Sequence, residues 1–224
     1  MLKPAFLLLL AVLVTGAGAA DAATTPTAVT AAVYPPTNTG WVRIHGGPTI
    51  NQIAVSRSGP SALLVSDATA GVTATPKCAS GAPTGYDDCG CEQLDAMTAT
   101  CTNPYGTGIN VSLEAGDDTL RVSSPTRVYA RGGDGSDRLT AGSGNDALGD
   151  QGGNDRMSGR QGNDTLVPGR GHDSAFGGAG DDYLLLHNGD RDRRIDCGRG
   201  NDHAVIDRRL DPPPLDCEHV SYSR

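Results

Sequence analysis

"AGSGNDALGDQGGNDRMSGRQGNDTL", which runs from Ala141 to Leu166, contains the triplet Gly-Asn-Asp three times at intervals of nine residues. Glycine and aspartate are poor formers of helices and of ordinary strands. Their recurrence at a constant interval therefore indicates a series of turns with one fixed geometry.

The repeat extends on both sides of this stretch and fills residues 132–185 with six consecutive units of nine. In every unit the fourth residue is Gly, the sixth is Asp and the eighth is apolar. The sixth places are Asp137, Asp146, Asp155, Asp164, Asp173 and Asp182. The eighth places are Leu139, Leu148, Met157, Leu166, Ala175 and Leu184. The invariant register argues against a disordered acidic linker and for a repeat architecture.

The pattern resembles G-G-x-G-x-D-x-U-x, the nonapeptide of the hemolysin-type, or repeats-in-toxin (RTX), calcium-binding proteins. The unbroken repeats cover about a quarter of the chain, and looser copies lie at residues 114–120 and 197–202. The resemblance implies an all-β fold, a right-handed parallel β-roll or β-solenoid in which two units make one coil. It also implies Ca²⁺ as the cofactor, bound in the turns.

With eighteen residues in a coil, equivalent residues stack about 4.8 Å apart. Two columns of carboxylates are expected on opposite edges, Asp137, Asp155 and Asp173 in one, and Asp146, Asp164 and Asp182 in the other. Ca²⁺ relieves their repulsion because it accepts carboxylates and backbone carbonyls together. Mg²⁺ fits less well, and the five histidines form no cluster for zinc.

Four calcium sites follow, one between each pair of successive column residues. Backbone carbonyls near the turn glycines are expected to complete the ligand shells: Gly133, Gly135, Gly142, Gly144, Gly153, Gly162, Gly171, Gly178 and Gly180. Further sites at Asp118 and Asp202 would require a bulge, since these residues lie nineteen residues before Asp137 and twenty after Asp182. Asn145, Asn154 and Asn163 are expected to tighten the turns.

The first 23 residues have the features of a secretory signal peptide, an apolar run from Ala5 to Val14 followed by small residues. The run is too short to span a bilayer, and no other apolar segment is long enough. We therefore expect a secreted, extracellular bacterial protein without a transmembrane anchor. Residues 24–49 form a Thr/Pro-rich leader, with one strand expected near Val42–Ile44.

Residues 50–112 are predicted to form a β-rich segment with a disulfide loop. Export favours disulfides over a zinc site, and the six cysteines lack paired C-x-x-C spacing. Cys89 and Cys91 are too close to bridge easily, so each is expected to pair with Cys78 or Cys101, in either order.

The roll is predicted over residues 113–206 and a C-terminal cap over 207–224. A Cys197–Cys217 disulfide would hold the tail over the last coil and protect its open end. Pro212–Pro214 are expected to stop further strand pairing.

The acidic residues are 23 Asp and 3 Glu, and the net charge is −8. The shorter carboxylate suits tight, cation-binding loops, and the acidic balance disfavours nucleic acid. No H-E-x-x-H or G-x-S-x-G motif indicates an enzyme. The predicted function is that of a secreted, non-catalytic protein that folds on binding about four or more calcium ions. The alternatives are a calcium-stiffened adhesin or cell-surface interaction module, with an unknown partner, and a small hydrolase in the N-terminal part.

Overall fold

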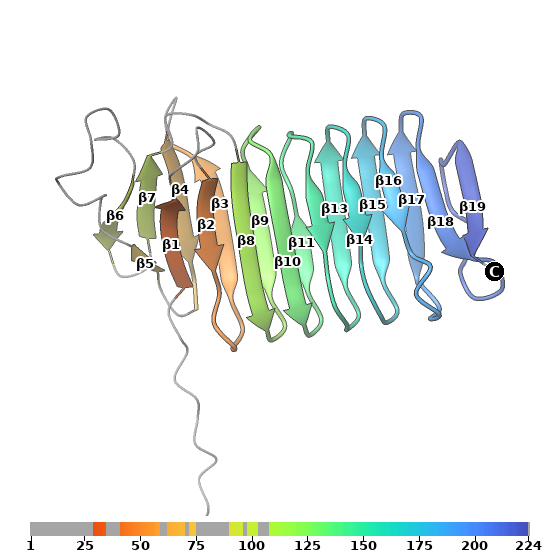
Figure 1. The fold of residues 1–224 in the computed structure, drawn as a ribbon, viewed down its shortest axis with the longest axis horizontal. Helices are drawn as coiled ribbons and strands as arrows, with labels where there is room; N and C mark the ends of the chain where they lie inside the picture. The colour runs from red at the N-terminus through yellow and green to blue at the C-terminus, as the bar shows by residue number, and fades with distance from the viewer. Residues whose placement is uncertain are drawn as a thin grey trace, which may run out of the picture.

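The computed structural model describes residues 29–34, 41–58, 62–69, 72–74, 90–95, 98–102 and 108–223. In these ranges every regular element is a β-strand, and the strands stack side by side into two sheets along one axis (Figure 1). No helix long and apolar enough to cross a membrane occurs within these ranges. The predicted signal peptide, residues 1–23, lies outside the described residues.

One sheet has ten strands among the described residues. In spatial order they are β19 (His219–Ser223), β18 (His203–Asp207), β16 (Tyr183–Leu185), β14 (Thr165–Val167), β12 (Ala147–Gly149), β10 (Val128–Asp134), β8 (Gly108–Ala115), β2 (Trp41–His45), β1 (Val29–Tyr34) and β5 (Val72–Ala74).

The other sheet has nine strands in the described part of the chain. Their spatial order is β17 (Arg194–Arg199), β15 (Ser174–Ala179), β13 (Arg156–Gln161), β11 (Arg138–Thr140), β9 (Thr119–Ser123), β3 (Gln52–Arg57), β4 (Ala62–Asp67), β7 (Thr98–Thr102) and β6 (Gly90–Asp95).

From β8 to β18 the chain alternates between the two sheets, and from β10 onward each strand pairs in parallel with the strand two places earlier. Leu148 lies opposite Leu166, and Leu166 opposite Leu184, each eighteen residues further along the chain. Leu139 and Met157 have the same relation in the other sheet. This register confirms a parallel β-solenoid, of about 6 turns, with two nine-residue units in each coil.

A narrow apolar core fills the space between the two sheets. The eighth residue of each unit points inward, and Leu139, Met157, Leu166 and Leu184 are all fully buried. A three-residue strand such as β14 contributes one inward side chain and two outward ones because side chains alternate across a strand. The core is therefore thin, and little apolar surface is buried in each coil.

The invariant glycine at the fourth place is required by the close stacking of one turn on the next. Gly153 has a φ of 148°, and a Cβ built on it would lie 1.7 Å from the carbonyl oxygen of Gly135. Any larger residue would separate the two coils, so only glycine permits this stacking.

The two sheets continue on the N-terminal side of the repeats. β2 pairs in parallel with β8, and β3 pairs in parallel with β9. The strand expected near Val42–Ile44 is β2, and β1, which was not expected, pairs with it in antiparallel orientation. Beyond β3, the strands β4, β7 and β6 are antiparallel. The pairing predicted for Cys78, Cys89, Cys91 and Cys101 falls on residues or side chains outside the described set.

The C-terminal end is capped by a disulfide and by an additional strand. The predicted Cys197–Cys217 disulfide is present, with 5.2 Å between the two Cα atoms. The expectation that Pro212–Pro214 would stop strand pairing was wrong, because β19 follows them and pairs in parallel with β18. The prolines lie in the connection between these strands, where the missing N–H groups remove no hydrogen bond from a sheet.

Replacing Leu166 by Ala should lower the free energy of unfolding of the calcium-loaded protein by about 2–5 kcal/mol, because the fully buried site leaves a cavity. Val167→Ala, next to it but 40% exposed, is the control and should change stability by less than about 0.5 kcal/mol. Denaturant unfolding measures both, and equal losses would contradict the assigned core.

Candidate metal sites in the turns

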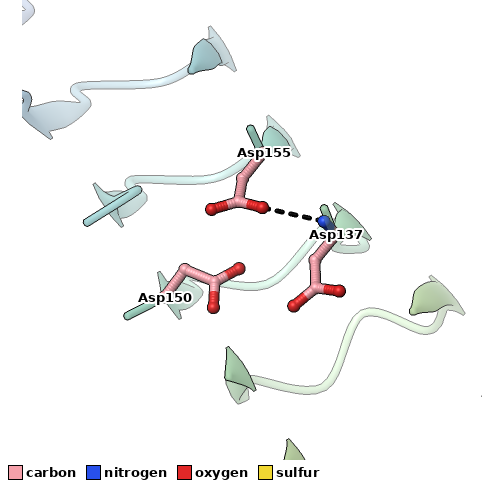
Figure 2. A group of neighbouring side chains, drawn as sticks. All are labelled: Asp137, Asp150 and Asp155. Carbon is pink, nitrogen blue, oxygen red and sulfur yellow. Dashed lines mark hydrogen bonds between the residues drawn. The ribbon is translucent and has the colours of Figure 1, made fainter. Parts of the chain in front are cut away.

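The turns that lead from the ten-stranded to the nine-stranded sheet carry the first column of buried aspartates. The backbone N–H of Asp137 donates to Oδ1 of Asp155 at 2.8 Å, as drawn in Figure 2. The N–H of Asp155 donates to Oδ1 of Asp173 at the same distance. Each carboxylate therefore accepts a hydrogen bond from the main chain of the preceding coil.

The turns at the opposite edge carry the second column in the same way. The N–H of Asp146 donates to Oδ1 of Asp164, and the N–H of Asp164 donates to Oδ1 of Asp182, both at 2.8 Å. The two columns predicted from the eighteen-residue step are therefore confirmed as structural features.

Asp118 and Asp202 also lie in these columns, despite their irregular spacing. The N–H of Asp118 donates to Oδ1 of Asp137, and the N–H of Asp182 donates to Oδ1 of Asp202, both at 2.7 Å. The step from Asp118 to Asp137 is one residue longer than the regular coil, and strand register places this extra residue in the turn between β9 and β10. The step from Asp182 to Asp202 is two residues longer than the regular coil, and these two residues lie between β16 and β17. The insertions are thus accommodated in other turns, and neither aspartate leaves its column.

The columns extend further than the sequence pattern indicated. Asp192 and Asp211 continue the first column at steps of nineteen residues, with N–H to Oδ1 distances of 3.0 Å. Glu218 ends the second column, since its Oε2 accepts the N–H of Asp202 at 2.9 Å. At the other end, Asn51 donates its N–H to Oδ1 of Asp118 at 2.6 Å. Asp192 and Asp211 follow in the sequence if steps of eighteen to twenty residues are allowed between successive column aspartates.

The asparagines that precede the column residues connect neighbouring coils, rather than tightening only their own turns. The side-chain oxygen of Asn145 accepts the N–H of Asn163 at 3.0 Å, and that of Asn163 accepts the N–H of Asp181 at 3.0 Å. The oxygen of Asn154 accepts the N–H of His172 at 3.0 Å. An outer row of amides therefore accompanies the buried carboxylates.

Most column carboxylates have one oxygen that is buried and has no hydrogen-bond partner. These orphaned Oδ2 atoms belong to Asp118, Asp137, Asp155, Asp164, Asp173, Asp182, Asp192 and Asp202. Asp146 differs, because its Oδ2 accepts the N–H of Gly142 at 3.2 Å. A buried carboxylate oxygen without a donor is costly in free energy, so its presence at eight equivalent places calls for a cation.

Burial also raises the pKa of these carboxyl groups. It raises the pKa of Asp155 and Asp164 to about 7 and that of Asp118 and Asp182 to about 6, against the lowering effect of the backbone N–H each one accepts. Neighbouring column carboxylates raise each of these pKa values further. Without a cation, the columns therefore hold protons close to neutral pH.

The donors in these turns suit a hard divalent cation. The carboxylates supply oxygen atoms, and the turn glycines supply carbonyl oxygens. The carbonyl oxygens of Gly135, Gly144 and Gly162 each face the equivalent glycine of the next coil, at about 2 Å from the position that a Cβ on that glycine would take. The carbonyl of Gly133 instead accepts the N–H groups of Gln151 and Gly152, at 3.2 and 3.3 Å. An all-oxygen donor set fits Ca²⁺, and when bound the ion would neutralise carboxylates of adjacent coils.

The fold and its turns define a class, the parallel β-solenoid with buried carboxylate columns along both edges. Residues 131–166 and 169–191 match the family model of the RTX calcium-binding nonapeptide repeat, in 4 copies. This part of the chain therefore consists of RTX calcium-binding nonapeptide repeats, and Ca²⁺ is their cofactor. Searches of curated proteins and of solved structures returned no match.

The calcium-free protein should lose stability as the pH rises from about 4 to about 7. In this window the folded carboxyls of Asp155 and Asp164, with pKa values of about 7, retain protons that the unfolded chain has released, so folding is favoured at the acidic end. Circular dichroism in chelator should show more β signal at about pH 5 than at about pH 8. The opposite order would contradict the burial of these groups in the calcium-free fold.

Proposed function

We propose that the protein is a secreted, non-catalytic calcium-binding β-roll protein that folds on binding several Ca²⁺ ions outside the cytoplasm. The observation that carries this proposal is the row of buried, unpartnered Oδ2 atoms along both edges of the solenoid. With so thin a core, the binding free energy of the ions would also be free energy of folding.

The proposed ligands are the column aspartates, with one ion between successive coils. The sites expected from the sequence use Asp137, Asp155 and Asp173 on one edge, and Asp146, Asp164 and Asp182 on the other. The hydrogen-bonded columns support additional spaces of the same kind, next to Asp118, Asp192 and Asp202. Carbonyls of the turn glycines would supply the remaining oxygens.

The RTX roll is typically non-catalytic, which supports a binding role. Secretion is supported by the signal-like residues 1–23 and by the Cys197–Cys217 disulfide, since disulfides persist in oxidising compartments. Determining the N-terminus of the exported protein tests secretion. Turnover on esterase, protease or glycosidase substrates would overturn the non-catalytic assignment.

Calcium titration of the mature protein should produce a cooperative gain of β signal in circular dichroism, reversed by chelator. The physical reason is that each ion neutralises carboxylates of two coils and so joins them. Magnesium is the control and should be much less effective, because it retains its waters and requires a strict octahedron. No calcium response, or an equal response to magnesium, would refute the proposed function.

Asp182→Asn and Asp181→Asn form a matched pair that separates a ligand from a surface carboxylate. Both residues accept one backbone N–H from an adjacent coil, but Asp182 is buried with an unpartnered Oδ2 while Asp181 is exposed. Isothermal titration should show fewer or weaker calcium ions for Asp182→Asn, with affinity at the neighbouring sites reduced about tenfold or more. Asp181→Asn should bind as the wild type does, and equal effects would contradict the assignment.

The outward face of the ten-stranded sheet favours a second candidate function, an interaction module stiffened by calcium. A shallow hollow of about 490 Å³ lies there, lined by residues that include Tyr129, Ala147 and Thr165. Small side chains beside an exposed tyrosine provide a surface on which a partner could pack. Calcium-dependent binding to bacterial envelope fractions, abolished by Thr165→Arg, would support this function over simple calcium binding.

A further inference from the structure

Asp150 occupies the first place of its nine-residue unit, a place that is crowded against a column carboxylate. In three other units this residue is glycine, and a Cβ built on it would lie within 2.1 Å of Asp137 Oδ2, 2.0 Å of Asp164 Oδ2 or 2.4 Å of Asp182 Oδ2. Each of these is the aspartate of the same unit. A side chain at the first place is therefore directed toward the carboxylate at the sixth.

The remaining first places show that Asp150 is unique among the six units. They are Gly132, Ala141, Gly159, Pro168 and Gly177. In the first column, the parallel bridges Asp134–Gly152 and Gly152–Arg170 set the register, so residue 150 lies one coil after Gly132 and one before Pro168. Among the first places of the six units, residue 150 alone carries a carboxylate.

Figure 2 shows the carboxyl groups of Asp137, Asp150 and Asp155 close to one another. One oxygen from each lies within 4.8 Å of the others. A Ca²⁺ ion at about 2.3–2.6 Å from each ligand can join two oxygens that are at most about 4.6–5.2 Å apart. The three carboxylates are therefore close enough to share one ion.

The hydrogen bonds leave an oxygen of each of these residues free for a cation. Oδ1 of Asp150 accepts the N–H groups of Gly133 and Gln151, at 2.5 and 2.9 Å, while its Oδ2 is buried without a partner. Asp137 and Asp155 are each 2% exposed, and the Oδ2 of each is also unpartnered. Three buried oxygens without hydrogen-bond partners, close to one another, are an independent sign of a cation-binding space.

We propose that Asp150 is a third carboxylate ligand of the site between Asp137 and Asp155, and makes it the tightest calcium site of the roll, filled first. The proposal rests on the proposed calcium binding and deepens it. Elsewhere in the six units two aspartates face each intercoil space, and calcium affinity rises with the number of charged ligands. Filling this site first would join the coils on either side of residue 150 before the others.

The test is isothermal titration of the full chain with calcium chloride, after removal of calcium by chelator. Wild type should bind one ion at least about tenfold more tightly than the rest. Asp150→Asn, which removes the charge, and Asp150→Gly, which restores the glycine found one coil earlier, should both lose this first ion's higher affinity. The total number of bound ions should remain, because Asp137 and Asp155 are unchanged.

Asp134→Asn is the matched control, since it removes one exposed acidic charge from the end of β10. It should retain the tight first ion. Circular dichroism in saturating calcium verifies that every variant is folded, and Asp150→Gly provides the test if the asparagine variant is not.

Two results overturn the proposal, and they are distinguishable. If the Asp150 variants bind calcium as wild type and Asp134→Asn do, then Asp150 is not a ligand, while the proposed function stands. If wild type binds no calcium, both the proposed function and the role of Asp150 fail.

Discussion

The structure depends on one arrangement, a carboxylate whose two oxygens have different partners. Oδ1 of each column aspartate accepts the backbone N–H of the column residue one coil earlier, which fixes the distance and register between coils. In eight of these aspartates Oδ2 stays buried beside it without a donor. The same side chain that aligns the coils thus carries the charge that repels its neighbours in the column, and a bound cation would neutralise this charge without disturbing the alignment.

The thin core follows from the same arrangement. Turns of six residues leave three residues for strands such as β11, β12 and β14, and one apolar side chain from each fills the interior. So little apolar burial cannot by itself offset the cost of burying carboxylates, which is why the proposed function makes the bound ions contribute to folding. The two ends need other means, and they have the added sheet strands at one end and the Cys197–Cys217 disulfide with β19 at the other.

The proposed calcium dependence would link the folding of the molecule to its location. A protein whose columns bind Ca²⁺ would remain loosely folded where the ion is scarce and become rigid where it is plentiful. The repeats are not equivalent in this respect, because Asp150 adds a buried, unpartnered oxygen to one intercoil space. A regular scaffold with one stronger site could order its coils from the middle outward.

The nine-residue period by itself determined the fold class, the eighteen-residue coil, the inward row from Leu139 to Leu184 and both aspartate columns, because every unit must place the same atoms in the same positions. Tertiary structure alone decided what lies off that period. Asp192, Asp211 and Glu218 join the columns at steps of nineteen, nineteen and sixteen residues, because strand pairing rather than the sequence period sets their positions, and β19 returns to the sheet after the prolines. Asp150 takes the place of the glycine that opens three other units, and it lies five positions before Asp155 and thirteen after Asp137 in the sequence. Their proximity exists only once the turns are stacked.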